Sequence, residues 1–130
     1  MNYFYAIVHK DEDSAFGVTF PDLPGCFSAA DTMEEVIPNA VEALQLWFED
    51  QPVVAPAPLD AVRDQARQDL ADGAFIVAVP YIRATGRMMR VNISMDAGMI
   101  DAIDKAAAER SMTRSGFLMQ ASRNEIESRR

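Results

Sequence analysis

The sequence predicts an α+β protein of two domains, residues 1–82 and residues 83–130. In the first domain, β-branched and aromatic runs and amphipathic helical stripes follow one another in the order β-β-β-α-α-β, which is typical of an antiparallel layout. The second domain reads as one strand followed by two helices. The charge changes at the same boundary: residues 1–82 hold 14 acidic and three basic residues, a net charge of −11, whereas residues 83–130 hold six acidic and nine basic residues, a net charge of +3.

Four strands are predicted in the first domain. The apolar runs Tyr3–Val8 and Ala15–Phe20 flank a polar turn and form a hairpin. Cys26–Ala29 follows a turn rich in Pro and Gly and reads as a short third strand. Phe75–Ile82 is a fourth strand, and Pro80 within it favours an edge position or a strand end.

The first predicted helix starts near Thr32. Thr32 and Glu35 form a capping-box pattern, and Asp31 and Glu34 offer the same pattern one residue earlier. Pro38 removes one helical hydrogen bond, so we expect a kink or a later start of the regular helix. The apolar stripe that defines this helix consists of Val36, Ile37, Ala40, Leu44, Trp47 and Phe48.

A second amphipathic helix is predicted over Pro58–Asp72. Pro58 suits the first turn of a helix and Gly73 suits its end. The apolar face of this helix consists of Leu59, Val62, Ala66 and Leu70. Gln51–Ala57 before it is a loop, and Arg83–Arg87 is a short linker to the second domain.

The second domain begins with a strand, Met88–Met95, whose two faces differ. Arg90, Asn92 and Ser94 point to one side, because successive strand side chains alternate. The opposite face is apolar and consists of Val91, Ile93 and Met95. A lone strand needs a partner, and two paired copies make a ribbon that fits the major groove of B-DNA. The pattern resembles a ribbon-helix-helix DNA-binding module, which implies a homodimer through this domain.

The predicted ribbon carries the residues that we expect to read DNA bases. Arg90 can donate two hydrogen bonds to guanine, Asn92 can pair with adenine, and Ser94 is short and supportive. The alternative is an ordinary strand with a solvated polar face. The two helices of suitable length behind the strand favour DNA binding.

The two helices of the second domain are predicted over Asp96–Arg110 and Thr113–Ser128. Ser111 stands in the turn between them, where related modules often have Gly in a left-handed conformation. Thr113 is a natural N-cap, and a helix N-terminus attracts anions. We therefore expect a DNA phosphate at this N-terminus, contacted by Thr113, Arg114 and Ser115, although plain capping by Thr113 explains the same residues.

The first domain resembles the HicB-type antitoxins over about residues 3–82. The resemblance depends on three segments, Phe20–Phe27, Asp31–Glu35 and Asn39–Leu44, and Pro38 departs from the family pattern. It implies a partial ribonuclease H-like fold and binding to HicA, a small basic toxin with a double-stranded-RNA-binding-like fold that cleaves mRNA. It also implies a tail that represses the operon's own promoter, and self-association that can build tetramers.

A nuclease is the main enzymatic alternative, because the implied fold is ribonuclease H-like. Metal-dependent cleavage needs several carboxylates around two ions. The acids Asp11, Glu12, Asp13, Asp22 and Asp31 lie in turns, and none lies in the middle of a strand. We interpret them as solvated loop acids and predict that the protein is not an enzyme.

A metal-sensing repressor is a second alternative, and it depends on His9 and Cys26. They are the only His and the only Cys of the chain, and two ligands from separate strands make a poor site. The simpler interpretation is a hydrogen-bonded His and a buried Cys, so we expect no metal and no cofactor. A Ser–His–Asp triad is also excluded, because no nucleophile motif accompanies His9.

Composition is consistent with a soluble intracellular protein, and the resemblance to HicB-type antitoxins implies the cytoplasm of a prokaryote. A single Cys cannot form an intrachain disulfide, no apolar run is long enough to span a bilayer, and the N-terminus lacks the pattern of a signal peptide. The net charge of −11 on the first domain suits a basic protein partner, although solubility alone explains such a charge.

The sequence therefore predicts a type II antitoxin and autorepressor whose toxin-contacting residues are unknown. The alternative is a stand-alone ribbon-helix-helix repressor with a ligand-sensing or oligomerising front domain.

Overall fold

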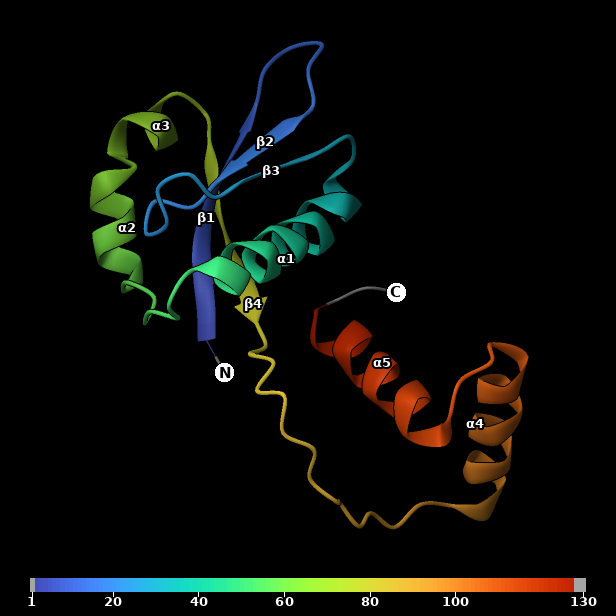
Figure 1. Ribbon diagram of the computed structural model, residues 1–130. Coiled ribbons are helices and arrows are strands. Elements are labelled where there is room, and N and C mark those ends of the chain that lie inside the picture. Colours follow the sequence, from blue (N-terminus) through green and yellow to red (C-terminus); the bar gives the residue numbers. More distant parts are fainter. Residues whose placement is uncertain (1, 128–130) are drawn as a thin grey trace. The chain divides into compact units, whose positions relative to one another are not determined.

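The computed structural model describes residues 2–127 and has an α+β architecture (Figure 1). The chain divides into two compact units, and the boundary along the chain lies between Arg83 and Ala84. Within the described residues, the N-terminal unit contains a four-stranded sheet with three helices, and the C-terminal unit contains two helices. No helix among residues 2–127 is both long enough and apolar enough to cross a bilayer.

The sheet is antiparallel throughout and has the order β3-β2-β1-β4. All four predicted strands are present, with small shifts at their ends. The edge position predicted for the last strand is confirmed, and Pro80 lies there opposite Tyr3 of the central strand. The strands are β1 (Asn2–Lys10), β2 (Phe16–Thr19), β3 (Phe27–Ala30) and β4 (Phe75–Tyr81).

Helix α1 (Met33–Asp50) covers one face of the sheet and closes the main core (Figure 1). Alternate residues of β1 point toward it, so apolar side chains two residues apart are buried together. An aromatic cluster closes one part of this core: the Phe48 ring centroid lies 5.4 Å from that of Phe4 and 4.7 Å from that of Tyr81. Fully buried members of the core include Phe4, Val8, Val36, Val41, Leu44 and Val79.

The start of α1 differs from the sequence prediction in two ways. Thr32 is the N-cap residue, but its side chain makes no capping hydrogen bond; its carbonyl instead accepts from the Glu35 N–H at 3.2 Å. The predicted capping box is therefore wrong. The helix also runs from Met33 to Asp50 without a break at Pro38. Pro38 lies near the helix start and has no backbone N–H. The one helical hydrogen bond that it cannot donate is the bond to the carbonyl of Glu34, in the first turn.

The opposite face of the sheet is covered by two short helices, α2 (Leu59–Gln65) and α3 (Arg67–Ala71) (Figure 1). The prediction of one helix over Pro58–Asp72 is wrong, because the chain leaves helical geometry at Ala66 (φ −96°, ψ 13°). Alanine is a strong helix former, so local propensity does not cause this break. It occurs where Ala66 is buried against Ile7 of the sheet. Gly73, with φ +102°, follows α3 and ends the helical region as predicted.

The C-terminal unit contains α4 (Ala97–Glu109) and α5 (Arg114–Ile126), close to the two predicted ranges. The predicted last residue, Ser128, lies outside the described residues. Between Tyr81 and Ala97 the single chain forms no helix or strand, so the predicted strand Met88–Met95 is not formed. The physical reason is that a strand needs hydrogen-bonding partners, and the predicted partner was a second copy.

Candidate interaction surfaces

Side-chain caps fix both helix starts of the C-terminal unit. The Asp96 carboxylate accepts hydrogen bonds from the N–H groups of Gly98 (2.8 Å) and Met99 (3.4 Å). The Thr113 hydroxyl accepts from the Gly116 N–H at 3.0 Å, which confirms its predicted role as an N-cap. Ser111 in the connecting turn has φ +54°, the left-handed conformation expected there. The α4–α5 corner is therefore defined by local hydrogen bonds.

Arg114 is engaged within the chain. Its Nε and Nη2 each donate to one carboxylate oxygen of Asp104 on α4, both at 2.8 Å. The hydrogen bonds and charge of Arg114 lower the pKa of the Asp104 carboxyl, and those of Asp104 raise the pKa of Arg114. Sequence reasoning missed this pair, which links the start of α5 to α4 across a separation of ten residues.

The predicted phosphate site at the N-terminus of α5 depends on free backbone donors. The first N–H groups of an α-helix lack intrahelical acceptors, and the helix dipole adds a partial positive charge there. The Thr113 hydroxyl and the Arg114 guanidinium already have protein partners. Among the predicted phosphate-contacting residues, the backbone N–H groups and the exposed Ser115 side chain are the groups best placed for an anion.

The segment before α4 is open to solvent. Arg90, Asn92 and Ser94, the residues predicted to read DNA bases, are exposed. The apolar side chains beside them are also exposed: Val91 is 74% exposed and Ile93 is 62% exposed. Exposure of two large apolar side chains so close together is typical of an interaction surface.

A hollow of about 840 Å³ lies between this segment and the two helices. It brings Arg90, Asn92, Arg114 and Ser115 to one surface, whereas Ser94 and Thr113 are outside its lining. The remaining lining is mainly apolar and consists of Met88, Met89, Val91, Ile93, Met95, Ile100, Ile103, Leu118, Met119 and Ser122. An apolar hollow beside an unpaired extended segment is suited to receive a second protein chain.

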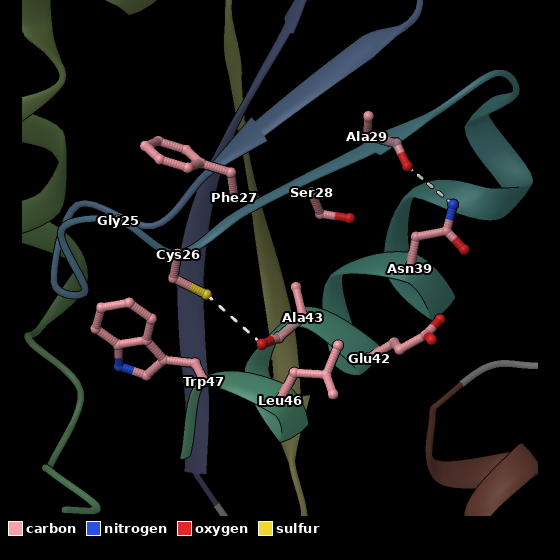
Figure 2. A pocket seen from close by; sticks show the side chains of 10 residues that line it. All are labelled: Gly25, Cys26, Phe27, Ser28, Ala29, Asn39, Glu42, Ala43, Leu46 and Trp47. Atoms are coloured by element: carbon pink, nitrogen blue, oxygen red, sulfur yellow. Dashed lines mark hydrogen bonds between the residues drawn. The ribbon is translucent and has the colours of Figure 1, made fainter. Parts of the chain in front are cut away.

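The N-terminal unit has a groove of about 560 Å³ between β3 and α1 (Figure 2). The Asn39 side chain donates to the Ala29 carbonyl at 2.9 Å and bridges the helix to the strand. The Cys26 thiol points toward the Ala43 carbonyl, with sulfur and oxygen 3.8 Å apart. The groove is lined by Gly25, Cys26, Phe27, Ser28, Ala29, Asn39, Glu42, Ala43, Leu46 and Trp47.

One end of this groove is shaped by Gly25 and Trp47. Gly25 has φ +101°, a left-handed conformation that favours glycine, and a Cβ there would lie 3.4 Å from the Trp47 ring. Cys26 beside it is buried, and burial raises the pKa of its thiol to about 11. A thiol with this pKa is protonated at neutral pH, so it is a poor nucleophile.

Sequence reasoning did not identify the groove as a site. Six of its residues lie in two segments of the motif that resembles HicB antitoxins, Phe20–Phe27 and Asn39–Leu44, which was the available signal, but the contact between these segments is tertiary. Of the loop acids, Asp22 is not simply solvated as predicted: its carboxylate accepts from the Ala57 N–H at 2.8 Å and anchors the loop before α2. Among residues 2–127, no cluster of three or more acidic, His or Cys side chains is arranged to hold a metal ion.

Known proteins resemble both units of the chain. Residues 4–122 match the model of a family described as HicB-like antitoxin of bacterial toxin-antitoxin system. An uncharacterized 14.9 kDa protein from the rep-hol intergenic region of Haemophilus phage HP1 is 31% identical over 132 residues, which cover 94% of this chain and 96% of that protein.

Two solved structures have the same overall fold. The crystal structure of the Burkholderia pseudomallei antitoxin HicB aligns over 100% of both chains, with 28% sequence identity and a TM-score of 0.52. The crystal structure of antitoxin HicB3 aligns over 95% of this chain and 97% of that chain, with 29% identity and a TM-score of 0.51. The similarity therefore includes the N-terminal sheet and the C-terminal helices together.

Proposed function

Because this chain belongs to the HicB-like antitoxin family, we propose that it is the antitoxin of a type II toxin–antitoxin system, which neutralises a HicA-like mRNA-cleaving toxin and represses its own operon. The observation that carries the proposal is the family match over residues 4–122, which spans both units. The N-terminal unit, with the partial ribonuclease H-like fold that the family implies, binds the toxin. The C-terminal unit binds DNA.

The C-terminal unit acts as a dimer with a ribbon-helix-helix arrangement. Segment 88–95 of each copy pairs with that of the other copy, and this pairing supplies the strand hydrogen bonds that one chain lacks. Val91 and Ile93, exposed in the single chain, then face the apolar hollow over α4 and α5, and Arg90 and Asn92 face the major groove. Two symmetric DNA half-sites follow from the two-fold axis of the dimer.

A DNA phosphate binds at the N-terminus of α5, mainly through backbone N–H groups and Ser115. Arg114 contributes indirectly, because its pairing with Asp104 holds this N-terminus against α4. The net charge of +3 on residues 83–130 also favours the phosphate backbone, so DNA affinity falls as salt rises.

Toxin neutralisation belongs to the N-terminal unit, whose net charge of −11 over residues 1–82 complements a basic protein. A second copy of the same unit would be repelled by this charge at long range. The tetramers that the family implies would then need short-range contacts that offset the repulsion.

A gel-shift titration with the DNA upstream of the chain's own gene tests DNA binding. We expect the double variant Arg90→Ala with Asn92→Ala to lose specific binding by roughly 100-fold or more, since each bidentate base contact contributes about 1–3 kcal/mol of discrimination. The matched control is Arg87→Ala, an exposed basic residue outside the ribbon. Unchanged operator affinity of the double variant would contradict base reading by this segment.

Co-expression with the toxin tests neutralisation. The full-length chain is expected to restore growth of cells that express the basic protein encoded beside its gene, and the Arg90→Ala, Asn92→Ala variant should restore growth equally well. A chain that represses the promoter but does not restore growth would favour the stand-alone repressor.

A further inference from the structure

The sheet of the N-terminal unit has two edges that differ in accessibility. At one edge, Pro80 in β4 removes a backbone donor. The other edge is β3, Phe27–Ala30, whose sequence Phe-Ser-Ala-Ala has neither the charge nor the proline with which proteins protect exposed edges. The Asn39 side chain contacts the Ala29 carbonyl only, near one end of this strand.

Two large apolar side chains are exposed in the lining of the groove along this edge. Phe27 of β3 is 67% exposed and Leu46 of α1 is 57% exposed. Leu46 comes from α1 and borders the groove, whereas the Phe27 ring points away from α1, because strand side chains alternate and the neighbouring Cys26 points toward Ala43 (Figure 2). Exposed apolar residues in a groove with a polar border are typical of protein-binding sites.

The border of the groove is acidic. Helix α1 contains five acidic residues and no Lys or Arg. Glu35, Glu42 and Glu49 are spaced seven residues apart, so they lie on one face of α1 together with Leu46. This charge decides between two occupants: a second copy would bring the same negative helix to the groove, whereas a basic protein would be attracted to it.

We propose that the groove between β3 and α1 is the docking site of the basic toxin; this inference rests on the proposed function. An extended segment of the toxin lies along β3, where one apolar side chain packs against Leu46 in the groove and the next, on the other face, packs against Phe27. Lys or Arg side chains of the same segment contact Glu42 and the carboxylates beside it. Affinity comes mainly from the apolar contact, and the acidic border mainly speeds association.

The test compares variants of the full-length chain for binding to the toxin. The probe is the small basic protein that co-purifies with the chain, separated by denaturant and refolded. Leu46→Arg should weaken binding by roughly 30-fold or more, as loss of a central anchor does. Glu42→Arg should weaken it by about tenfold, chiefly through a slower association rate at low salt. Both residues are exposed, and unchanged thermal unfolding verifies that the variants are folded.

Two matched controls make the same chemical changes elsewhere on the unit. Leu59→Arg alters a partly exposed leucine on α2, on the opposite face of the sheet, and Glu12→Arg alters an exposed acid in the β1–β2 turn. Neither should change toxin affinity by more than about twofold, the range of an uninvolved surface site. Loss of binding confined to the two groove variants supports the proposal.

Other outcomes overturn it in distinguishable ways. If both groove variants bind the toxin as tightly as the wild type, or if the controls lose as much affinity, the toxin binds elsewhere on the chain. The proposed function would then still stand. A Leu46→Arg chain that binds toxin normally but has a smaller oligomeric mass makes the groove a contact between copies. A wild-type chain that retains no basic protein contradicts the proposed function and the docking site together.

Discussion

The two units differ in how far each one completes its own core. In the N-terminal unit, Phe4, Val36 and Leu44 are fully buried in the apolar core between α1 and the sheet. In the described part of the C-terminal unit, Ile103 and Ala107 are the buried apolar residues, while Met88, Val91 and Ile93 are each more than half exposed. The difference supports the proposal that the first unit folds on its own contacts and that a second copy completes the second unit.

The strongest test of this difference introduces a charge into the apolar face of segment 88–95. Ile93→Glu is expected to convert the dimer to a monomer and to abolish operator binding, because pairing would bury an unpaired carboxylate. Sedimentation velocity of the full-length chain measures the mass. Asn92→Glu places the same charge on the polar face, so it should lose DNA binding but remain dimeric. A dimeric Ile93→Glu variant would show that this face is not at the interface.

A large effect is also expected in the core of the N-terminal unit. Phe4→Ala should lower the free energy of unfolding by about 3–5 kcal/mol, since it removes a fully buried aromatic ring. Fluorescence of Trp47, the only tryptophan, reports denaturant unfolding of this unit. The neighbouring change Tyr3→Ala alters a side chain that is 43% exposed and should cost much less. Equal costs would contradict the assignment of faces on β1.

A smaller effect is expected from the cap of α5. Thr113→Ala should destabilise the C-terminal unit by about 1 kcal/mol, because the Gly116 N–H loses its acceptor. Ser115→Ala, two residues later, removes a hydroxyl without a capping role and should be nearly neutral for stability. Thermal unfolding followed by helical circular dichroism compares them. The capping assignment fails if Ser115→Ala is the more destabilising change.

The last effect, which is absent at neutral pH, is a pH dependence caused by Cys26. Burial raises the pKa of this thiol from its ordinary value of 9.0 to about 11 in the folded protein. The neutral thiol therefore contributes stability that is fully present below pH 9 and is lost as pH rises from about 9 to about 11. The wild type should lose more stability over this range than Cys26→Ala, in denaturant titrations monitored by Trp47. Parallel pH profiles would contradict a raised pKa.

Local signals explain what could be predicted from the sequence. Runs of β-branched, aromatic and other apolar residues between turn residues located the four strands, and the short-range caps of Asp96 and Thr113 located the starts of α4 and α5. Each of these features depends on residues within a few positions of one another. The left-handed turn at Ser111 was predictable for the same reason.

Tertiary contacts explain what could not be predicted. The break at Ala66 occurs where that residue packs on the sheet, although its own propensity is helical. The groove depends on the contact between Asn39 and Ala29, and the role of Asp22 depends on a hydrogen bond to Ala57, 35 residues away. The pairing of Arg114 with Asp104 likewise appears only when α4 and α5 are brought together. Base reading by Arg90 and Asn92 stays a prediction.

The central claim is that a second copy completes the C-terminal unit, whereas the N-terminal unit is complete alone. Amide hydrogen exchange of the full-length chain, measured across a range of protein concentrations, tests it most directly. We predict that the amides of β1 are protected at every concentration, and that amides within residues 89–95 become protected only as the dimer forms. Free exchange of residues 89–95 in a fully dimeric sample would contradict the claim.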